Sequence, residues 1–399
     1  MDDGLIGASD IAAALAATPC DVAARISRLV GLLEAAGCDA LVVTNLRNIR
    51  YLTGFSGSAA QLVVHANGAT LCTDGRYESQ APVELRDVGV TAVRIEITSE
   101  DGGVAPSAKQ AFFDAIRAAS KEPRSAGGVL RVGLEATSIS WSEQRRIAGW
   151  VSELGVDGVL VATDGVIETL RLVKDPGEVV RVELAASIAD LAFAQVRGRL
   201  LDGPTESEFG LELDLAMRRL GAAERSFETI VASGPNSALP HARPGMRRIE
   251  RGDLVVIDFG AMLDSYRSDM TRTVMVGEPS AVQQRLLDVV TAAQAAGARA
   301  IGPGVGCREV DAACREVIAS AGWAERFVHG TGHGVGLDIH EAPWVNSRSA
   351  ATLAPGQVVT VEPGVYLPGV GGVRVEDTLL VTESGARPLT RAPKDPILV

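Results

Sequence analysis

The sequence predicts two domains of mixed α/β structure. The chain has 399 residues, enough for two domains of ordinary size with substantial cores. In the first part, short apolar runs alternate with amphipathic segments, which favours a sheet covered by helices. A change of composition near Asp164–Pro176 precedes a long helix and several strand pairs. We therefore assign residues 1–21 to an N-terminal extension, 22–165 to an α/β domain and 166–399 to an α+β domain.

Helices and buried strands are expected in turn within the first domain. A helix is predicted over Val22–Gly37, because its apolar residues recur at the helical period and Gly37 suits a C-terminal cap. Asn67 and Gly68 predict a hairpin between two strands. Further strands are expected at 38–44, 90–97, 129–135 and 157–162, and further helices at 107–119 and 140–154.

The second domain is expected to begin with a long helix. Asp175, Pro176 and Glu178 are typical start signals for it. Further helices are predicted at 206–220 and, as a pair, within 281–322, and strands at 227–234, 254–276 and 358–381. The last two strand regions are interpreted as counterparts of each other, because each presents two carboxylates on strands joined by a short connection.

Composition and charge exclude several classes of partner. The chain has 38 Lys and Arg against 50 Asp and Glu, a net charge of −12, which argues against nucleic acid or an anionic membrane as the main partner. No run approaches the roughly 20 apolar residues of a transmembrane helix. The N-terminus lacks the basic region of a secretory signal, and the cysteines form no CxxC motif or disulfide framework. We therefore expect a cytoplasmic protein.

Histidine is concentrated in one segment, Phe327–Pro343. This segment holds His329, His333 and His340, three of the five histidines of the chain. Glycine alternates through it at positions 330, 332, 334 and 336, which disfavours a helix and suits an extended backbone that another segment approaches closely. The alternative is a flexible glycine loop with incidental histidines. The clustering favours metal ligation, proton handling or both.

Four carboxylates interrupt apolar strand patterns in the second domain. They are Asp258, Asp269, Glu362 and Glu376, and the apolar run before Asp258 predicts its full burial. A buried carboxylate costs free energy unless it is paired, hydrogen-bonded or bound to a metal. One such residue is usually explained by a salt bridge or a helix cap, but four exceed the basic residues nearby. Only Arg374 is expected beside them, on the same strand face as Glu376.

Two divalent ions would neutralise these four carboxylates. Such ions typically lie about 3.5–4 Å apart, and a water between them loses a proton near neutral pH and becomes the nucleophile of a hydrolysis. Oxygen-rich ligation with a single imidazole favours Mn²⁺ or a similar ion over a cysteine-type zinc site. The remaining histidines are then available to hold a substrate carbonyl, stabilise the tetrahedral intermediate or pass a proton to the leaving amine.

The sequence resembles the pita-bread metallopeptidases of peptidase family M24, which include methionine aminopeptidase, aminopeptidase P, prolidase and creatinase. The order Asp258, Asp269, His333, Glu362 and Glu376 matches the five-ligand pattern of this family, within the motifs IDFG, SDMTRT, HGTGHGVGLDIHE, TVEPGVY and VRVEDT. The resemblance runs from about Val22 to the C-terminus. It implies a creatinase-like N-terminal α/β domain followed by an α+β pita-bread catalytic domain.

The same resemblance implies a role for each ligand. Asp258 would chelate one metal, Asp269 and Glu376 would bridge the two metals, and His333 and Glu362 would complete the other site. Glu362 also matches the residue assigned as general base on the bridging water.

Four further residues match substrate-contact positions of the aminopeptidase P and prolidase branch. His241, in SGPNSALPHARP, matches a substrate-binding histidine, His329 and His340 match two more, and Arg374 matches an arginine two positions before the bridging glutamate. The alternative for each is a satisfied core residue or one supporting the ligands. Arg348 is a further candidate for holding a substrate carboxylate.

The expected activity is hydrolysis of the peptide bond preceding proline, in dipeptides, as by a prolidase, or in short peptides, as by an aminopeptidase P. Methionine aminopeptidases usually lack a sizeable leading domain, and creatinase-type enzymes or non-enzymatic binding proteins of this fold would be expected to lose metal ligands. A dinuclear phosphatase would usually carry more histidine. The resemblance further implies a homodimer and two divalent ions, Mn²⁺ in first place, with Co²⁺, Fe²⁺ or Zn²⁺ as alternatives.

Overall fold

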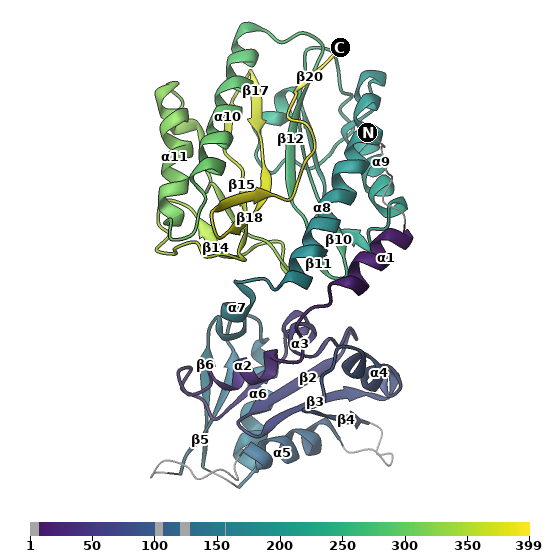
Figure 1. Cartoon of the computed structure of the whole chain (residues 1–399), viewed down its shortest axis with the longest axis vertical. Helices are drawn as coiled ribbons and strands as arrows, with labels where there is room; N and C mark the ends of the chain where they lie inside the picture. Colours follow the sequence, from purple (N-terminus) through teal and green to yellow (C-terminus); the bar gives the residue numbers. More distant parts are fainter. Residues whose placement is uncertain (1–7, 100–106, 120–127, 156) are drawn as a thin grey trace. The chain divides into compact units, whose positions relative to one another are not determined.

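The computed structural model describes residues 8–99, 107–119, 128–155 and 157–399 (Figure 1). The described residues form two compact units, a smaller one within residues 20–171 and a larger one in which residues 8–19 join residues 172–399. The domain boundaries expected from the sequence at residues 22 and 166 stay a prediction.

The smaller unit is built on a six-stranded mixed sheet of order β4-β3-β2-β1-β5-β6. Its strands are β1 (Ala40–Val43), β2 (Ala60–His65), β3 (Gly68–Asp74), β4 (Val93–Thr98), β5 (Leu130–Glu135) and β6 (Gly158–Thr163). Strand β2 is antiparallel to both neighbours, and the other adjacent pairs are parallel. The predicted hairpin is present, but His65 pairs with Gly68, so its turn residues are Ala66 and Asn67.

Helices cover the sheet of the smaller unit on both faces. Its helices are α2 (Arg25–Val30), α3 (Leu46–Thr53), η1 (Gly75–Tyr77), α4 (Gln80–Asp87), α5 (Ala108–Ala119), α6 (Trp141–Glu153) and α7 (Val166–Arg171). Val42 and its neighbours on one face pack against Phe112 of α5 and Ile147 of α6. Leu41, which points to the opposite face, is also buried, as expected for a covered sheet.

The larger unit includes a short helix within the predicted N-terminal extension. This helix, α1 (Ala8–Ala17), places Ile11 in the core beside α8. The other helices are α8 (Pro176–Val196), η2 (Arg197–Asp202), α9 (Glu206–Arg219), η3 (Gly234–Ala238), α10 (Ala281–Ala300), α11 (Cys307–Ser320) and η4 (Ala324–Arg326). The predicted start of α8 is confirmed by a capping box of Asp175 and Glu178 with Pro176 in the first turn.

Two helix pairs enclose the strands of the larger unit (Figure 1). Helices α8 and α9 pack on a sheet of order β20-β12-β9-β8, and α10 and α11 contribute to a second core with the sheet β14-β13-β15-β18-β19. The strands of this unit are β7 (Glu224–Arg225), β8 (Ile230–Ser233), β9 (Leu254–Phe259), β10 (Ala261–Leu263), β11 (Tyr266–Arg267), β12 (Met270–Val276), β13 (Gly332–Gly334), β14 (Glu341–Val345), β15 (Val358–Val361), β16 (Gly364–Leu367), β17 (Gly371–Arg374), β18 (Asp377–Thr382), β19 (Gly385–Pro388) and β20 (Ile397–Leu398).

The four carboxylates lie in or directly beside strands of the two sheets. Asp258 lies within β9, whereas Asp269 directly precedes β12. Glu362 directly follows β15, and Glu376 directly precedes β18. Because β9 pairs with β12 and β15 pairs with β18, both antiparallel, each sheet has one carboxylate in or directly beside each of two neighbouring strands. The expectation that all four lie inside strands is therefore wrong for three of them.

All five cysteines are free thiols. Among the helices described, none has the combination of length and apolar character that a membrane crossing requires.

Candidate metal centre and active site

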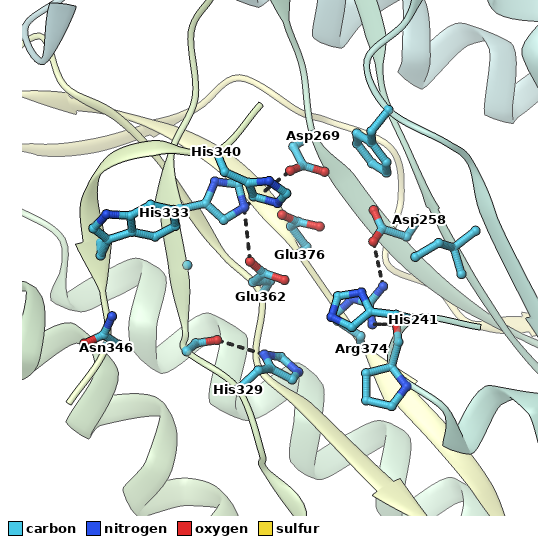
Figure 2. A pocket seen from close by; sticks show the side chains of 16 residues that line it. His241, Asp258, Asp269, His329, His333, His340, Asn346, Glu362, Arg374 and Glu376 are labelled. Atoms are coloured by element: carbon cyan, nitrogen blue, oxygen red, sulfur yellow. Dashed lines mark hydrogen bonds and ion pairs between the residues drawn. The ribbon is translucent and has the colours of Figure 1, made fainter. Parts of the chain in front are cut away.

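A cavity of about 270 Å³ in the larger unit brings the predicted chemical groups together. Figure 2 shows the side chains that line it. They are Phe227, Ile230, Pro240, His241, Asp258, Asp269, His329, Gly330, Gly332, His333, His340, Trp344, Asn346, Glu362, Arg374 and Glu376. Every one of the nine residues that the sequence singled out for metal binding or catalysis is in this set.

Close backbone packing places His333 among the carboxylates. His333 is the central residue of β13, which pairs with β14 and β15. A Cβ atom at Gly332 would lie 2.0 Å from the carbonyl oxygen of Thr360, and one at Gly334 would lie 2.2 Å from that of Ala342. The alternating glycines therefore form an extended backbone with close neighbours, as predicted, and not a flexible loop.

Ligand atoms of three predicted metal-binding residues converge. Asp269, His333 and Glu376 are buried, and one ligand atom of each lies within 4.8 Å of the others. The Nε2 atom of His333 is 3.6 Å from Asp269 Oδ2 and 3.4 Å from Glu362 Oε1. His333 Nδ1 is 3.0 Å from the carbonyl oxygen of Gly334. Because a carbonyl oxygen only accepts hydrogen bonds, the neutral ring carries its proton on Nδ1. That tautomer leaves the lone pair of Nε2 facing the carboxylates, as a metal ligand requires.

Two carboxylate oxygens in the cavity have no hydrogen-bond partner among the described residues. They are Asp258 Oδ1 and Glu376 Oε1, both inaccessible to solvent. Such a buried acceptor costs free energy unless a donor or a cation satisfies it. The donor set and these two oxygens fit a pair of divalent cations.

Three of the four carboxyl groups in the cavity have raised pKa values. Burial, reinforced by neighbouring carboxylates, raises the pKa values of Asp269 and Glu376 well above their ordinary range. Burial also raises the pKa of Glu362 to about 8. These shifts indicate that the site disfavours four uncompensated negative charges, which is the situation that bound divalent ions relieve.

Asp258 differs from the expectation of full burial. Its side chain is 14% exposed, because it points into the cavity and not into the sheet core. Its Oδ2 atom accepts a hydrogen bond of 2.6 Å from Arg374 Nη2.

Arg374 is buried and all its donor nitrogens are engaged. Besides Asp258, it donates from Nε to Thr271 Oγ1 at 3.1 Å and from Nη1 to Pro240 O at 3.1 Å and to the Tyr366 hydroxyl at 2.8 Å. The side chain therefore orients Asp258 and the wall of the cavity.

The three other histidines lie on different sides of the cavity (Figure 2). His329 has both ring nitrogens occupied, Nδ1 at 2.8 Å from Gly330 O and Nε2 at 3.0 Å from the Tyr366 hydroxyl. Burial, with the charge of Arg374, lowers its pKa to about 4. His340 stacks edge-on against His333 at a centroid distance of 4.4 Å. His241 is exposed at the cavity wall.

The structure adds residues that sequence reasoning missed. Tyr366 connects Arg374 to His329, and its only sequence signal was its place in the TVEPGVY motif. Trp344 and Asn346 line the cavity of about 270 Å³, which we call the metal cavity, and also an adjoining hollow of about 600 Å³. Arg348 is exposed beside that adjoining hollow and does not line the metal cavity.

Comparisons with known proteins agree with this architecture. The Creatinase/Prolidase N-terminal domain matches residues 25–173, and Metallopeptidase family M24 matches residues 181–383. An Xaa-Pro dipeptidase of Pyrococcus furiosus is 35% identical over 373 residues, which cover 93% of this chain and 99% of the relative.

Solved structures are similar over the same length. The Xaa-Pro dipeptidase from Bacillus anthracis has a TM-score of 0.85 at 36% identity and covers 94% of this chain and 100% of its own. The X-Pro aminopeptidase from Thermotoga maritima has a TM-score of 0.81 at 32% identity, with the same coverage of 94% and 100%. This chain is therefore a member of metallopeptidase family M24, with a creatinase-type N-terminal domain in front of a pita-bread catalytic domain.

Proposed function

We propose that this metallo-exopeptidase hydrolyses the peptide bond preceding proline, in dipeptides or short peptides, with two bound divalent ions. The observation that carries the proposal is the convergence of four carboxylates and one imidazole on a single cavity. Two of the carboxylate oxygens there have no hydrogen-bond partner within the described structure. The specificity for Xaa-Pro bonds is supported by relatives and similar structures that are described as Xaa-Pro dipeptidases or X-Pro aminopeptidases.

The five donor residues would hold the ions. Asp258 would bind one ion, Asp269 and Glu376 would lie between the two, and His333 and Glu362 would bind the other. When bound, two such ions supply a nucleophilic water at neutral pH and polarise the scissile carbonyl. Mn²⁺ is our proposal for the ion, because the donors are mainly oxygen atoms.

Other side chains of the cavity would handle protons and orient the substrate. Glu362 would take a proton from the attacking water, since an ionised carboxylate within reach of that water can act as a general base. His241 and His340 would contact the scissile carbonyl or the leaving amine. His329 and Arg374 would act through their partners, since their nitrogens are already engaged.

The proposal is tested by comparing an Xaa-Pro dipeptide with an Xaa-Pro-Yaa tripeptide, using protein loaded with Mn²⁺ and a chelator-treated control. Cleavage of the dipeptide alone would identify a prolidase, and cleavage of the tripeptide would identify an aminopeptidase P. If the protein binds Mn²⁺ and cleaves neither peptide, the proposed specificity is wrong, whereas family membership is unaffected.

Two further proposals concern the state of the protein in the cell. A homodimer is proposed, which light scattering would contradict by finding a monomer. A cytoplasmic location is proposed because the cysteines are free and no membrane-spanning helix is described.

A further inference from the structure

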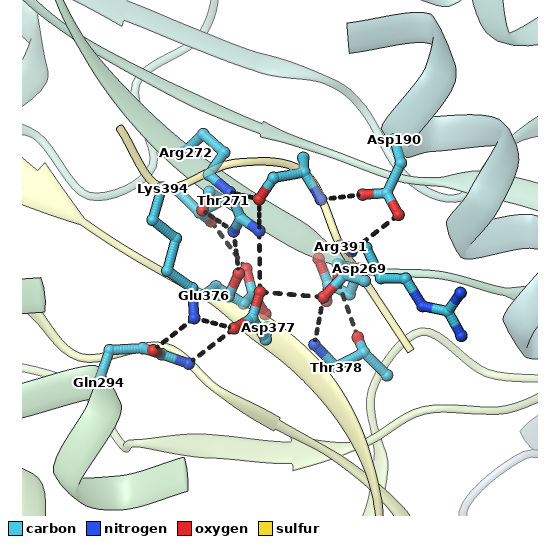
Figure 3. Close-up of polar contacts among 12 residues, drawn as sticks. Asp190, Asp269, Thr271, Arg272, Gln294, Glu376, Asp377, Thr378, Arg391 and Lys394 are labelled. Atoms are coloured by element: carbon cyan, nitrogen blue, oxygen red, sulfur yellow. Dashed lines mark hydrogen bonds and ion pairs between the residues drawn. The ribbon is translucent and has the colours of Figure 1, made fainter. Parts of the chain in front are cut away.

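The C-terminal segment, Thr390–Lys394, makes polar contacts with residues next to the cavity. Figure 3 shows Lys394 of this segment beside Asp377, close to Glu376. Asp190 on α8 fixes its backbone, because the two carboxylate oxygens of Asp190 each accept a hydrogen bond of 2.8 Å, from the amides of Arg391 and Ala392. This anchoring gives the segment a defined position relative to the core of the larger unit.

Arg272 joins the C-terminal segment to Glu376. Its Nε and Nη2 atoms donate to the carbonyl oxygen of Ala392 at 3.1 and 2.7 Å. Its Nη1 atom donates to the carbonyl oxygens of Glu376 and Thr271. One buried guanidinium therefore holds the C-terminal segment and the backbone of the proposed bridging glutamate together.

Asp377 is the second connection. Its Oδ1 atom is 2.9 Å from Arg272 Nη2, and its carboxylate forms an ion pair with Lys394. Gln294 of α10 donates to Asp377 Oδ2 at 3.1 Å and accepts from Lys394 Nζ at 3.0 Å. Asp377 does not line the metal cavity. Glu376 and Asp377 are neighbours in the sequence, but only Glu376 lines the cavity, whereas the Asp377 carboxylate pairs with Arg272 and Lys394.

The same segment also connects to Asp269, the other proposed bridging residue. Thr390 Oγ1 donates to Asp377 Oδ1 at 3.1 Å and accepts from the amide of Thr378 at 3.1 Å. The hydroxyl of Thr378 then donates to the carbonyl oxygen of Asp269 at 2.7 Å. Both bridging residues thus have backbone carbonyls held by groups that the C-terminal segment orients.

Backbone support matters here because the Glu376 side chain has little support of its own. Within the described structure its carboxylate has one hydrogen bond, of 2.7 Å from Thr271 Oγ1, and its other oxygen has none. A metal site needs its ligands held to within about 0.5 Å, and loss of supporting hydrogen bonds typically weakens metal affinity by about 10–100-fold.

We propose that the C-terminal segment is a positioning element of the metal centre, in which Lys394 and Asp190 act through Asp377 and Arg272 to place the two bridging carboxylates. This inference rests on the proposed two-metal function. The inference predicts that changes in the segment raise the dissociation constant of the more weakly bound ion, although none of the segment's residues lines the metal cavity.

The test measures the Mn²⁺ dissociation constants of the full chain by calorimetry and by competition with a chelator. Lys394→Met, which removes the charge from a partly exposed side chain, is expected to weaken binding of at least one ion by about tenfold or more. Lys394→Arg should restore the constant to within about threefold of wild type. Arg391→Met is the matched control, because the Arg391 side chain pairs with Glu183 at the surface and only its backbone amide meets Asp190.

Asp190→Ala provides a second variant, and thermal unfolding of each metal-free protein reports its stability separately. A variant that melts at a lower temperature but binds both ions with wild-type constants would show that the segment only stabilises the fold, and would overturn the inference. Wild-type protein that binds fewer than two ions would instead overturn the proposed function.

Discussion

At the scale of single residues, the metal cavity holds more negative charge than its protein neighbours neutralise. Arg374 pairs with Asp258, but its remaining donors go to Thr271, Pro240 and Tyr366. The other three carboxyl groups have raised pKa values, chiefly because they are buried. Removing single ligands, or changing the pH, should therefore alter metal content in predictable directions.

Glu376→Ala is expected to abolish metal loading and peptidase activity together, because it removes a proposed bridging ligand. Asp258→Ala should behave in the same way. Metal analysis of the purified variants, together with peptide hydrolysis, measures both effects. Glu383→Ala, at an exposed position of the same unit, is the control and should retain both. An active Glu376→Ala protein with its full metal content would contradict the two-metal proposal.

The stability of the metal-free protein should fall as the pH rises from about 5 to about 8. Burial raises the folded-state pKa of Glu362 from 4.5 to about 8, so in this interval the folded state binds a proton that the unfolded state has lost. The stabilisation is present at the acidic end and is lost as the pH approaches 8. Thermal unfolding in excess chelator measures it, and Glu362→Gln should flatten the dependence. The Mn²⁺ affinity of wild-type protein should rise over the same interval, because the ion competes with protons.

His241→Ala should leave the metal content unchanged and lower kcat by about a hundredfold or more, as expected for a group that assists proton transfer or stabilises the oxyanion. The exposed position of His241 on the cavity wall makes a large loss of stability unexpected. Metal analysis and steady-state kinetics on an Xaa-Pro peptide test this together. A protein that has lost its metal would show that His241 was assigned the wrong role.

At the scale of elements, the site depends on strands that approach more closely than side chains allow. Strand β13 places His333 between flanking glycines, and a methyl group at Gly332 would overlap the carbonyl oxygen of Thr360 at 2.0 Å. We therefore expect metal binding to depend on the close packing of β13 against its neighbours.

Gly332→Ala should lower the free energy of unfolding by about 2 kcal/mol or more, since overpacking against backbone cannot be relieved by a side-chain rotation. It should also weaken Mn²⁺ binding by displacing His333. Chemical denaturation and metal titration provide the two measurements. Gly198→Ala is the matched control in the same unit, because an added methyl group meets nothing within 4 Å there. Equal stability of the two variants would contradict the role assigned to close packing.

At the scale of the whole molecule, every proposed metal ligand lies in the larger unit, and the smaller unit has its own sheet and core. Since ligand binding stabilises the structure that contains the site, metal removal should loosen the two units unequally.

Hydrogen exchange should detect this difference. Chelation is expected to speed amide exchange in β9, β12, β13, β15 and β18, and to leave exchange in β1–β6 close to that of the metal-loaded protein. Mass spectrometry of peptic fragments, with and without Mn²⁺, measures both regions in one sample. Equal acceleration in both units would mean that the ions stabilise more than the unit that holds them.

The sequence by itself predicted most elements and the nine candidate residues that the structure places around one cavity. Helix starts such as the Asp175–Glu178 capping box, the apolar strands and the histidine-glycine segment all depend on residues close together in the chain, so their patterns are readable without a fold. The ligand set itself came from the resemblance of five short motifs to a family.

Only the tertiary structure decided how these residues support one another. It placed Asp258 partly exposed, turned Arg374 towards it, and joined Tyr366 to His329. It also placed Lys394 against Asp377, next in the chain to Glu376. These contacts join residues that are separated in the sequence. Each forms only because the fold brings the two sheets and the C-terminal segment together. No local pattern of residues contains that information.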